Sequence, residues 1–149
     1  VTAVTWSLAR GVEIDWANPQ HRHRTALHRA VCHGGDHRRT VEVLLEHGAN
    51  LEARDEDEQT PLILAAGHRQ SYESGTNDCS ICLVLLVAGA ETTAKDLYGK
   101  TALDKARQNG RNSCVAILEA WAGGEREVPT LQAAGAARGP DDEYYFEYP

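Results

Sequence analysis

The stretch TALHRAV at residues 25–31 decides the fold, because it returns twice along the chain, as TPLILAA (60–66) and TALDKAR (101–107). Each copy is followed by an apolar stretch, and these begin as VEVLLEHGA at Val41, ICLVLLVAGA at Ile81 and CVAILEAWAG at Cys114. A weaker echo, SLARGV, occupies residues 7–12. Repetition of this kind predicts a stack of similar units, each burying its apolar face against its neighbours.

The spacing within the repeats is regular at one place only. Twelve residues separate Gly48 from Thr60, and twelve again separate Gly89 from Thr101. The distance from the threonine to the glycine of one unit varies, from 23 residues after Thr25 to 29 after Thr60. We therefore expect connecting loops of fixed length between units and a variable turn inside each unit.

Local signals predict a pair of helices in each unit. The leading threonines are N-cap residues whose hydroxyl accepts a backbone N–H, and Pro61 follows where its missing N–H costs nothing. Gly48 and Gly89 supply the left-handed residue that ends the second helix. Small residues inside the first helices allow close packing: Ala30, Ala65, Ala66 and Ala106.

These residues resemble the ankyrin repeat, which has a period of about 33 residues and the signature T-P-L-H-x-A. TALH at residues 25–28 matches closely, whereas Ile63 and Asp104 replace the histidine in the later units. The resemblance implies an all-α ankyrin-repeat solenoid with about three full repeats, an N-terminal partial one and β-turn fingers.

On this register we expect an ankyrin-repeat domain at 1–123 and an acidic, Tyr-rich tail at 124–149. A degenerate capping half-repeat is predicted at 128–139. The expected parts of the domain are a partial second helix (1–9), fingers at 12–24, 49–59 and 90–100, and units at 25–48, 60–89 and 101–123. Finger one is two residues longer than its siblings, with the extra material in WANPQHRHR. The second unit has about two surplus residues, in GGDHRR, and the third about eight, in 67–78, which is either a neutral insertion or a functional loop.

Composition excludes several functions. The chain of 149 residues has a net charge of −7, which argues against a general nucleic-acid binder. It contains no apolar run long enough to span a bilayer, so we expect no membrane insertion. Because the chain contains no methionine, we expect a fragment of a longer regulatory or scaffold protein. The four cysteines are too few and too oddly spaced for a disulfide framework, so we expect them to be reduced, as in a cytoplasmic protein.

Catalysis, cofactors and metals are not indicated. The sequence lacks a nucleophile elbow, a P-loop and a dinucleotide fingerprint, so we expect no enzyme and no cofactor. His21, His23, His28, Cys32, His33 and His37 look like a ligand cluster, and Cys79-x-x-Cys82 is a ligand-like pair. In ankyrin-like repeats, however, the histidine of TALH is structural and bonds its own threonine and the backbone of a neighbouring finger. We therefore expect no metal site.

The remaining function is recognition of a partner protein or peptide through the finger tips and the inner faces of the first helices. Residues 21–39 hold five Arg and five His against one Asp, whereas 46–59 hold six acids against one Arg. Complementary neighbouring tips would steer a partner, or would simply attract each other as solvated charges. Trp16 is expected to pack between fingers. The candidate partner-binding residues are Arg22, Arg24, Arg29, His33, Asp55, Glu56, Asp57, Leu64, His68, Tyr98, Lys105 and Asn109.

A narrower resemblance concerns DWANP in finger one (15–19) and GKTALDKARQNGRNSCVAIL (99–118). They resemble the ankyrin region of multidomain Arf GTPase-activating proteins, where a tyrosine-containing acidic segment follows the repeats. The resemblance implies a small GTPase or a membrane-traffic regulator as partner. The acidic tail with Tyr144, Tyr145 and Tyr148 is expected to fold back onto the last unit, to cover a groove or to be a short motif that a partner reads. None of the present residues matches the zinc or the catalytic arginine of that family. The insertion at 67–78 departs from the pattern. The alternative function is a histidine-rich element that responds to metal or pH.

Overall fold

The described part of the protein is a set of paired helices. The computed structural model describes Gly11 and residues 13–32, 38–67 and 79–124. Its elements are η1 (Pro19–His21), α2 (Ala26–Cys32), α3 (Arg38–Glu46), α4 (Pro61–Gly67), α5 (Ser80–Val87), α6 (Ala102–Gln108) and α7 (Asn112–Ala122). Extended pairing in these residues is limited to one isolated antiparallel bridge, between Asn18 and Arg24. The predicted all-α class is confirmed.

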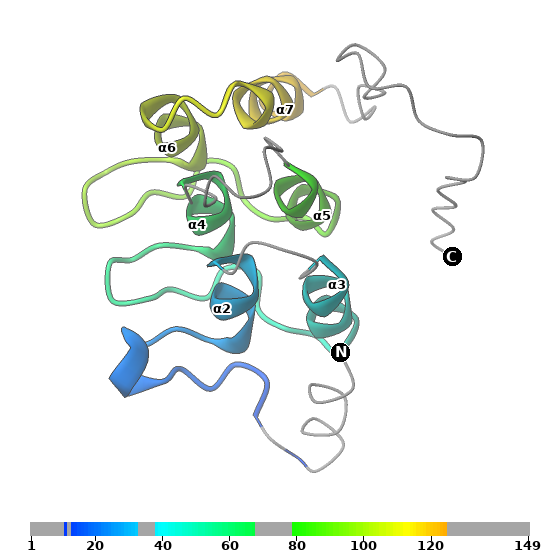
Figure 1. The fold of residues 1–149 in the computed structure, drawn as a ribbon, viewed down its shortest axis with the longest axis vertical. Coiled ribbons are helices and arrows are strands. Elements are labelled where there is room, and N and C mark those ends of the chain that lie inside the picture. The colour runs from blue at the N-terminus through cyan, green and yellow to red at the C-terminus, as the bar shows by residue number, and fades with distance from the viewer. Residues whose placement is uncertain (1–10, 12, 33–37, 68–78, 125–149) are drawn as a thin grey trace, which may run out of the picture.

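The helices form two layers (Figure 1). α2, α4 and α6 pack on one another in one layer, and α3, α5 and α7 do so in the other. Three long loops leave the helices on the side of the first layer: loop 1 (residues 13–24), loop 2 (49–59) and loop 3 (90–100). Each unit of the sequence repeat therefore contributes one helix to each layer and one loop to a common edge.

The predicted threonine caps are confirmed. The Thr25 hydroxyl accepts the His28 N–H at 3.4 Å, and the Thr60 hydroxyl accepts the Ile63 N–H at 3.3 Å. Thr101 forms a full capping box, because the Asp104 carboxylate also accepts the Thr101 N–H at 3.0 Å. The first helix of each described unit thus begins where its threonine satisfies an otherwise orphaned backbone donor.

The predicted glycine stops are confirmed as well. Gly48 and Gly89 have φ angles of 82° and 99°. Around each, two hydrogen bonds close the end of the preceding helix: Gly48 and Ala49 donate to Leu45 and Leu44, and Gly89 and Ala90 donate to Leu86 and Leu85. This is the Schellman arrangement, which a glycine adopts without the steric cost that a side chain would meet.

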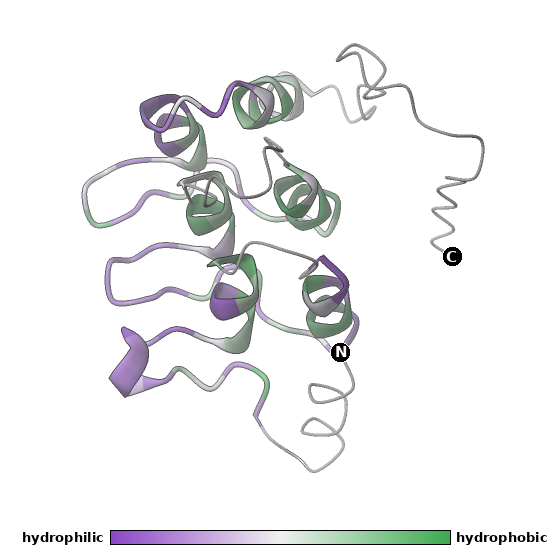
Figure 2. Cartoon of the chain, in the orientation of Figure 1, coloured by the Kyte–Doolittle hydropathy of each residue, from purple (hydrophilic) through white to green (hydrophobic). Residues whose placement is uncertain are grey.

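The core lies between the two layers, and Figure 2 shows hydrophobic residues concentrated in the helices while the loops are mainly hydrophilic. The middle helix α4 is buried from Pro61 through Ala66, because it has a helix on each side within its own layer and α5 behind it. Ala66 and Ala106 are fully buried. Each belongs to one of two helices that pack directly on one another, α4 and α6, which fits the predicted role of small residues in close packing.

The prediction that all four cysteines are reduced is wrong for two of them. Cys79 and Cys114 form a disulfide between the beginnings of α5 and α7. Their spacing of 35 residues looked irregular in one dimension, yet it is close to one repeat, so the two residues become neighbours when the units stack. The reduced state on which the cytoplasmic expectation rested is not the state seen here, and that location stays a prediction.

Several predicted features lie outside the described residues. They are the partial helix at 1–9, the enlarged turn that includes His33, nearly all of the insertion at 67–78, and the tail with its possible half-repeat.

The glycine stops can be tested at α5 and α7. Replacing Gly89 by alanine should lower the free energy of unfolding by about 1–2 kcal/mol, because a Cβ at this φ is strained even though nothing lies within 4 Å of it. Gly123, with φ of −75°, is the control, and Gly123→Ala should change stability by less than about 0.5 kcal/mol. Urea unfolding of the two variants measures the difference. Equal losses would show that the left-handed conformation is not what requires glycine.

Candidate functional site

The tips of the three loops are joined by backbone hydrogen bonds. The Glu56 N–H in loop 2 donates to the Arg22 carbonyl oxygen in loop 1 at 2.9 Å. The Leu97 N–H in loop 3 donates to the Asp57 carbonyl oxygen in loop 2 at 2.9 Å. Each tip is thereby fixed to its neighbour, and the loop edge is a single ordered surface rather than three independent loops.

One repeated polar position shapes all three loops. The side-chain oxygens of Asn18, Asp55 and Asp96 each accept the N–H of the residue two positions later, at 2.9, 3.0 and 2.9 Å. The backbone N–H groups of the same three residues donate to the carbonyl oxygens of Arg24, Gln59 and Lys100, respectively, and so close the tips. The closing bond spans six residues in loop 1 and four in the others, which places the two extra residues of finger one in this tip, within WANPQHRHR as predicted.

The two aspartates of this set are buried beside cations. The Asp55 carboxylate is 3.2 Å from Arg24 Nε, and the Asp96 carboxylate is 2.9 Å from Lys105 Nζ. Burial alone would raise the pKa of Asp96, but hydrogen bonds from the Lys100 N–H and the Lys105 ammonium outweigh it and lower the pKa below its usual 3.8. These charges organise the loops, and Asp55, at 4% exposure, offers a partner almost no surface.

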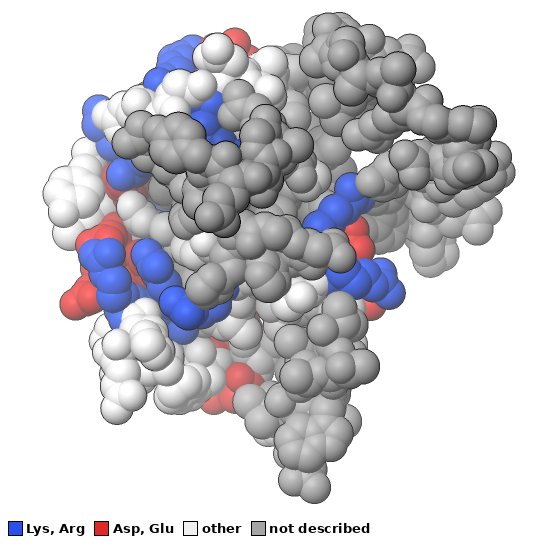
Figure 3. Space-filling model, in the orientation of Figure 1, with Lys and Arg blue, Asp and Glu red and all other residues white. Residues whose placement is uncertain are grey.

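The complementary charges predicted for the first two loop tips pair with one another within the chain. Arg22 pairs with Asp57 and lies 3.7 Å from Glu56, and all three side chains remain partly exposed. Figure 3 shows cationic and acidic side chains next to one another on the loop side of the molecule. Exposed pairs of this kind contribute about 0–1 kcal/mol each. The interpretation of the tips as mutually attracting solvated charge therefore describes these residues well.

The tip of loop 3 is different, because it is apolar and exposed. Leu97 is 63% exposed and Tyr98 is 69% exposed, more than any other large hydrophobic residue of the described chain. The Tyr98 ring lies 5.8 Å from Lys105 Nζ, so the ring extends from the loop toward α6. Sequence reasoning selected Tyr98 and missed Leu97. Aligning the closing aspartates would have found Leu97, because Glu56 occupies its place in loop 2.

The remaining candidate residues divide by burial. Arg29 is exposed on α2, whereas Leu64 is only 8% exposed and belongs to the core. Asn109 is half-buried, and its amide donates to the Gly67 carbonyl oxygen at 2.9 Å, which fastens α6 to the end of α4. Trp16, expected to pack between fingers, is instead 54% exposed. The other predicted site residues lie outside the described part: His33, His68, Tyr144, Tyr145 and Tyr148.

His28 has the structural role that the resemblance implied. Its Nε2 lies 3.0 Å from the Gln59 carbonyl oxygen, and its Nδ1 lies 2.9 Å from the Thr25 hydroxyl. Because a carbonyl only accepts, Nε2 carries the proton and Nδ1 accepts from Thr25, which defines a neutral ring. Within the described ranges there is no group of three or more His, Cys, Asp or Glu residues arranged to hold a metal ion.

Comparison with known proteins agrees with the geometry. The family model described as ankyrin repeats (3 copies) matches residues 1–96. The chain belongs to the ankyrin-repeat family. The helix pair α6 and α7 follows the matched residues and continues the same two layers.

No match to a curated protein was found. Ankyrin repeats are generally protein-interaction modules and are typically non-catalytic. None of the described helices has the length and apolarity needed to cross a membrane.

The buried carboxylate of loop 2 can be tested against its exposed neighbour. Asp55→Ala should lower the free energy of unfolding by about 3 kcal/mol, because the Asp57 and Gln59 N–H groups and Arg24 lose their acceptor. Asp57→Ala, which loses an exposed ion pair, should cost no more than about 1 kcal/mol. Chemical denaturation measures both. Similar losses would show that Asp55 does not organise the loop.

Acid should weaken the fold through His28. Burial lowers its pKa below 6.5, so below that pH the unfolded chain takes up a proton that the folded ring does not. Stability is therefore fully present above pH 6.5 and falls as the pH drops toward the folded pKa. Asp96 and Asp104, whose pKa values lie below 3.8, stay ionised across this range.

The measurement is the free energy of unfolding at pH 7.5 and at pH 5.5. We expect a lower value at pH 5.5 and a smaller difference between the two in His28→Gln. His21→Gln, at an exposed histidine, is the control and should keep the wild-type difference. A difference that persists unchanged in His28→Gln would assign the acid sensitivity to another group.

Proposed function

We propose that this chain is a non-catalytic module that binds a partner protein or peptide through the tips of its loops and the adjoining face of α2 and α6. The observation that carries the proposal is the exposed Leu97–Tyr98 pair on loop 3. Apolar side chains at a hydrogen-bonded loop tip contribute affinity at low entropic cost, because the loop is ordered before a partner binds. The family to which the chain belongs supports this function.

The surroundings of this pair indicate what a partner should offer. Lys95 is exposed and Lys100 half-buried on the two sides of the pair in the same loop, and Arg29 is exposed on α2. A partner with an apolar side chain for the tip and carboxylates beside it would complement these groups. Arg22, Glu56 and Asp57 pair with one another in the chain and would serve at the rim of such an interface, where charges affect association rate more than affinity.

The narrower expectations remain part of this proposal. A small GTPase or a membrane-traffic regulator is the partner class that the resemblance to Arf regulators implies. Recognition of Tyr144, Tyr145 and Tyr148 as a tail motif and a cytoplasmic, scaffolding or signalling role are further predictions. They rest on sequence resemblance and on the acidic, aromatic composition of the tail.

The test compares two variants of the full chain. Leu97→Ser with Tyr98→Ser removes the apolar tip, and Val87→Ser is the matched control, because Val87 is 43% exposed but lies at the end of α5. Immobilised wild type, the double variant and the control are each used to capture partners, which quantitative mass spectrometry identifies. The strongest partner is then purified, and its Kd for each chain is measured by calorimetry.

The double variant should bind at least about tenfold more weakly, which corresponds to about 1.4 kcal/mol, while Val87→Ser retains the wild-type Kd. Circular dichroism confirms that all three chains fold. An unchanged Kd in the double variant would place the binding surface away from loop 3.

A further inference from the structure

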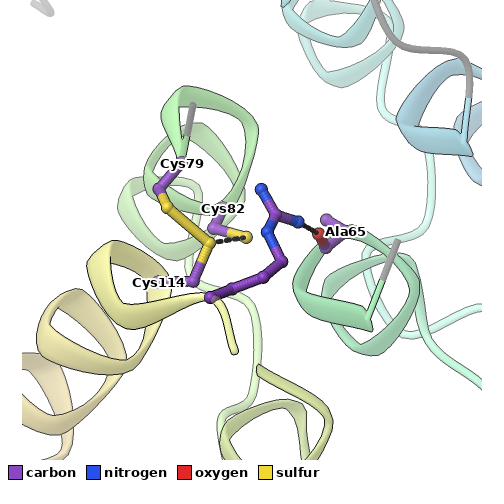
Figure 4. The surroundings of a disulfide bond; sticks show 5 residues. Ala65, Cys79, Cys82 and Cys114 are labelled. Carbon is purple, nitrogen blue, oxygen red and sulfur yellow. Dashed lines mark hydrogen bonds between the residues drawn. A yellow bond between two sulfur atoms is a disulfide. The ribbon is translucent and has the colours of Figure 1, made fainter. Parts of the chain in front are cut away.

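Three cysteine sulfurs meet between the beginnings of α5 and α7 (Figure 4). Cys79 is the N-cap residue of α5 and is bonded to Cys114 in the first turn of α7. Cys82, in the first turn of α5, places its Sγ 4.0 Å from Cys114 Sγ. All three residues are buried, with exposures of 6% for Cys79, 1% for Cys82 and 0% for Cys114. A thiol therefore lies in contact with a disulfide of the same chain.

The helical repeat brings both partners of Cys114 to one face. Cys79 and Cys82 are three residues apart, so they lie on the same side of the helical turn. They precede Cys114 by 35 and 32 residues, which are both close to one repeat of the stack. The start of α5 thus places two sulfurs, those of Cys79 and Cys82, near the single sulfur of Cys114 on α7. The fourth cysteine, Cys32, is on α2 in the other layer.

Attack on a disulfide requires a thiol to lose its proton, which burial opposes and a positive environment favours. The attacking species in disulfide exchange is the thiolate, which helix N-termini and nearby guanidinium groups stabilise. Both helices present their first turns here, and the buried Arg111 is the N-cap residue of α7. Its guanidinium donates to the carbonyl oxygen of Ala65 on α4, which Figure 4 shows across from the three cysteines.

We propose that Cys79, Cys82 and Cys114 form a thiol–disulfide exchange site in which Cys114 alternates between two partners. The Cys82 thiol gives up its proton, and its sulfur attacks Cys114 Sγ. The Cys82–Cys114 bond forms while the Cys79–Cys114 bond breaks, and Cys79 leaves as a thiolate that takes up the proton given up by Cys82, so one disulfide and one thiol remain. The two states have the same oxidation level, so the step requires no oxidant or reductant.

The exchange changes which part of α5 is tied to α7. In one state the link is made at the N-cap residue, and in the other it is made within the first turn. In the second state Cys79, the most exposed of the three, becomes the thiol. Reaction with a small disulfide such as oxidised glutathione would then begin at Cys79. This inference is independent of the proposed binding function.

The experiment maps the disulfides of the full chain. Wild type is purified without reductant, held at pH 8, blocked with an alkylating reagent and digested with trypsin. One tryptic peptide, residues 70–95, holds both Cys79 and Cys82, so tandem mass spectrometry must locate the alkyl group. We expect Cys114 to be linked to either residue, with the two populations within about tenfold of each other, a free-energy difference of at most about 1.4 kcal/mol.

Single substitutions test each partner. In Cys79→Ser, Cys82 should be linked to Cys114, and in Cys82→Ser, Cys79 should be linked to Cys114. Cys32→Ser is the control and should reproduce the wild-type map. The wild-type measurement stands without any variant, so the test does not depend on the folding of the substituted chains.

Three results would overturn the proposal. One is a wild-type map in which the Cys82–Cys114 link, after prolonged incubation at pH 8, is less than about a tenth of the Cys79–Cys114 link. Another concerns the two variants. It is a folded Cys79→Ser chain in which Cys82 and Cys114 are both alkylated, and so not linked, while the Cys82→Ser chain still forms the Cys79–Cys114 disulfide. The third is a wild type in which all four cysteines are alkylated under oxidising conditions.

Discussion

A single side-chain oxygen at one repeated position organises each loop, and the rest of the exposed edge depends on it. Asn18, Asp55 and Asp96 supply this oxygen, which accepts the N–H two residues later and holds the tip in a closed turn. The residues directly after Asp55 and Asp96, which are Glu56 and Leu97, donate the backbone bonds that join the tips. The buried carboxylates at two of these positions are tolerated because Arg24 and Lys105 lie beside them.

This arrangement determines which side chains are left for recognition. Most of the charges that suggest a binding surface in the sequence form ion pairs between loops 1 and 2. These pairs join Arg22 and Arg24 to acidic residues of loop 2. Loop 3 has the same backbone but carries Leu97 and Tyr98 where loop 2 carries Glu56 and Asp57. The same backbone therefore presents an apolar pair at loop 3 and charged side chains at loops 1 and 2. The two ends of the loop edge thus differ in polarity.

Helix limits and layers could be predicted from the sequence because they depend on local chemistry. Thr101 and Gly89 act within four or five residues of themselves, and their signals are visible in any window of that length. The role of His28 was also accessible, through resemblance. Burial of Leu64 and Asp55 was not, because it depends on which side of a short helix or loop faces the next unit. A helix of seven residues such as α4 makes two turns and carries little periodic pattern to settle that.

The cysteines show how a repeat can be used to find contacts that ordinary spacing rules miss. One position lies ten residues before the left-handed glycine that comes two residues after each second helix (Gly48, Gly89 and Gly124), and it is occupied by Arg38, Cys79 and Cys114. Residues at equivalent positions of successive units lie next to each other in the stack. In the unit of α3 the position holds an arginine whose guanidinium binds Glu42 on its own helix. In the next two units it holds sulfur, so the covalent link arises only between α5 and α7, where two equivalent positions carry the same reactive element.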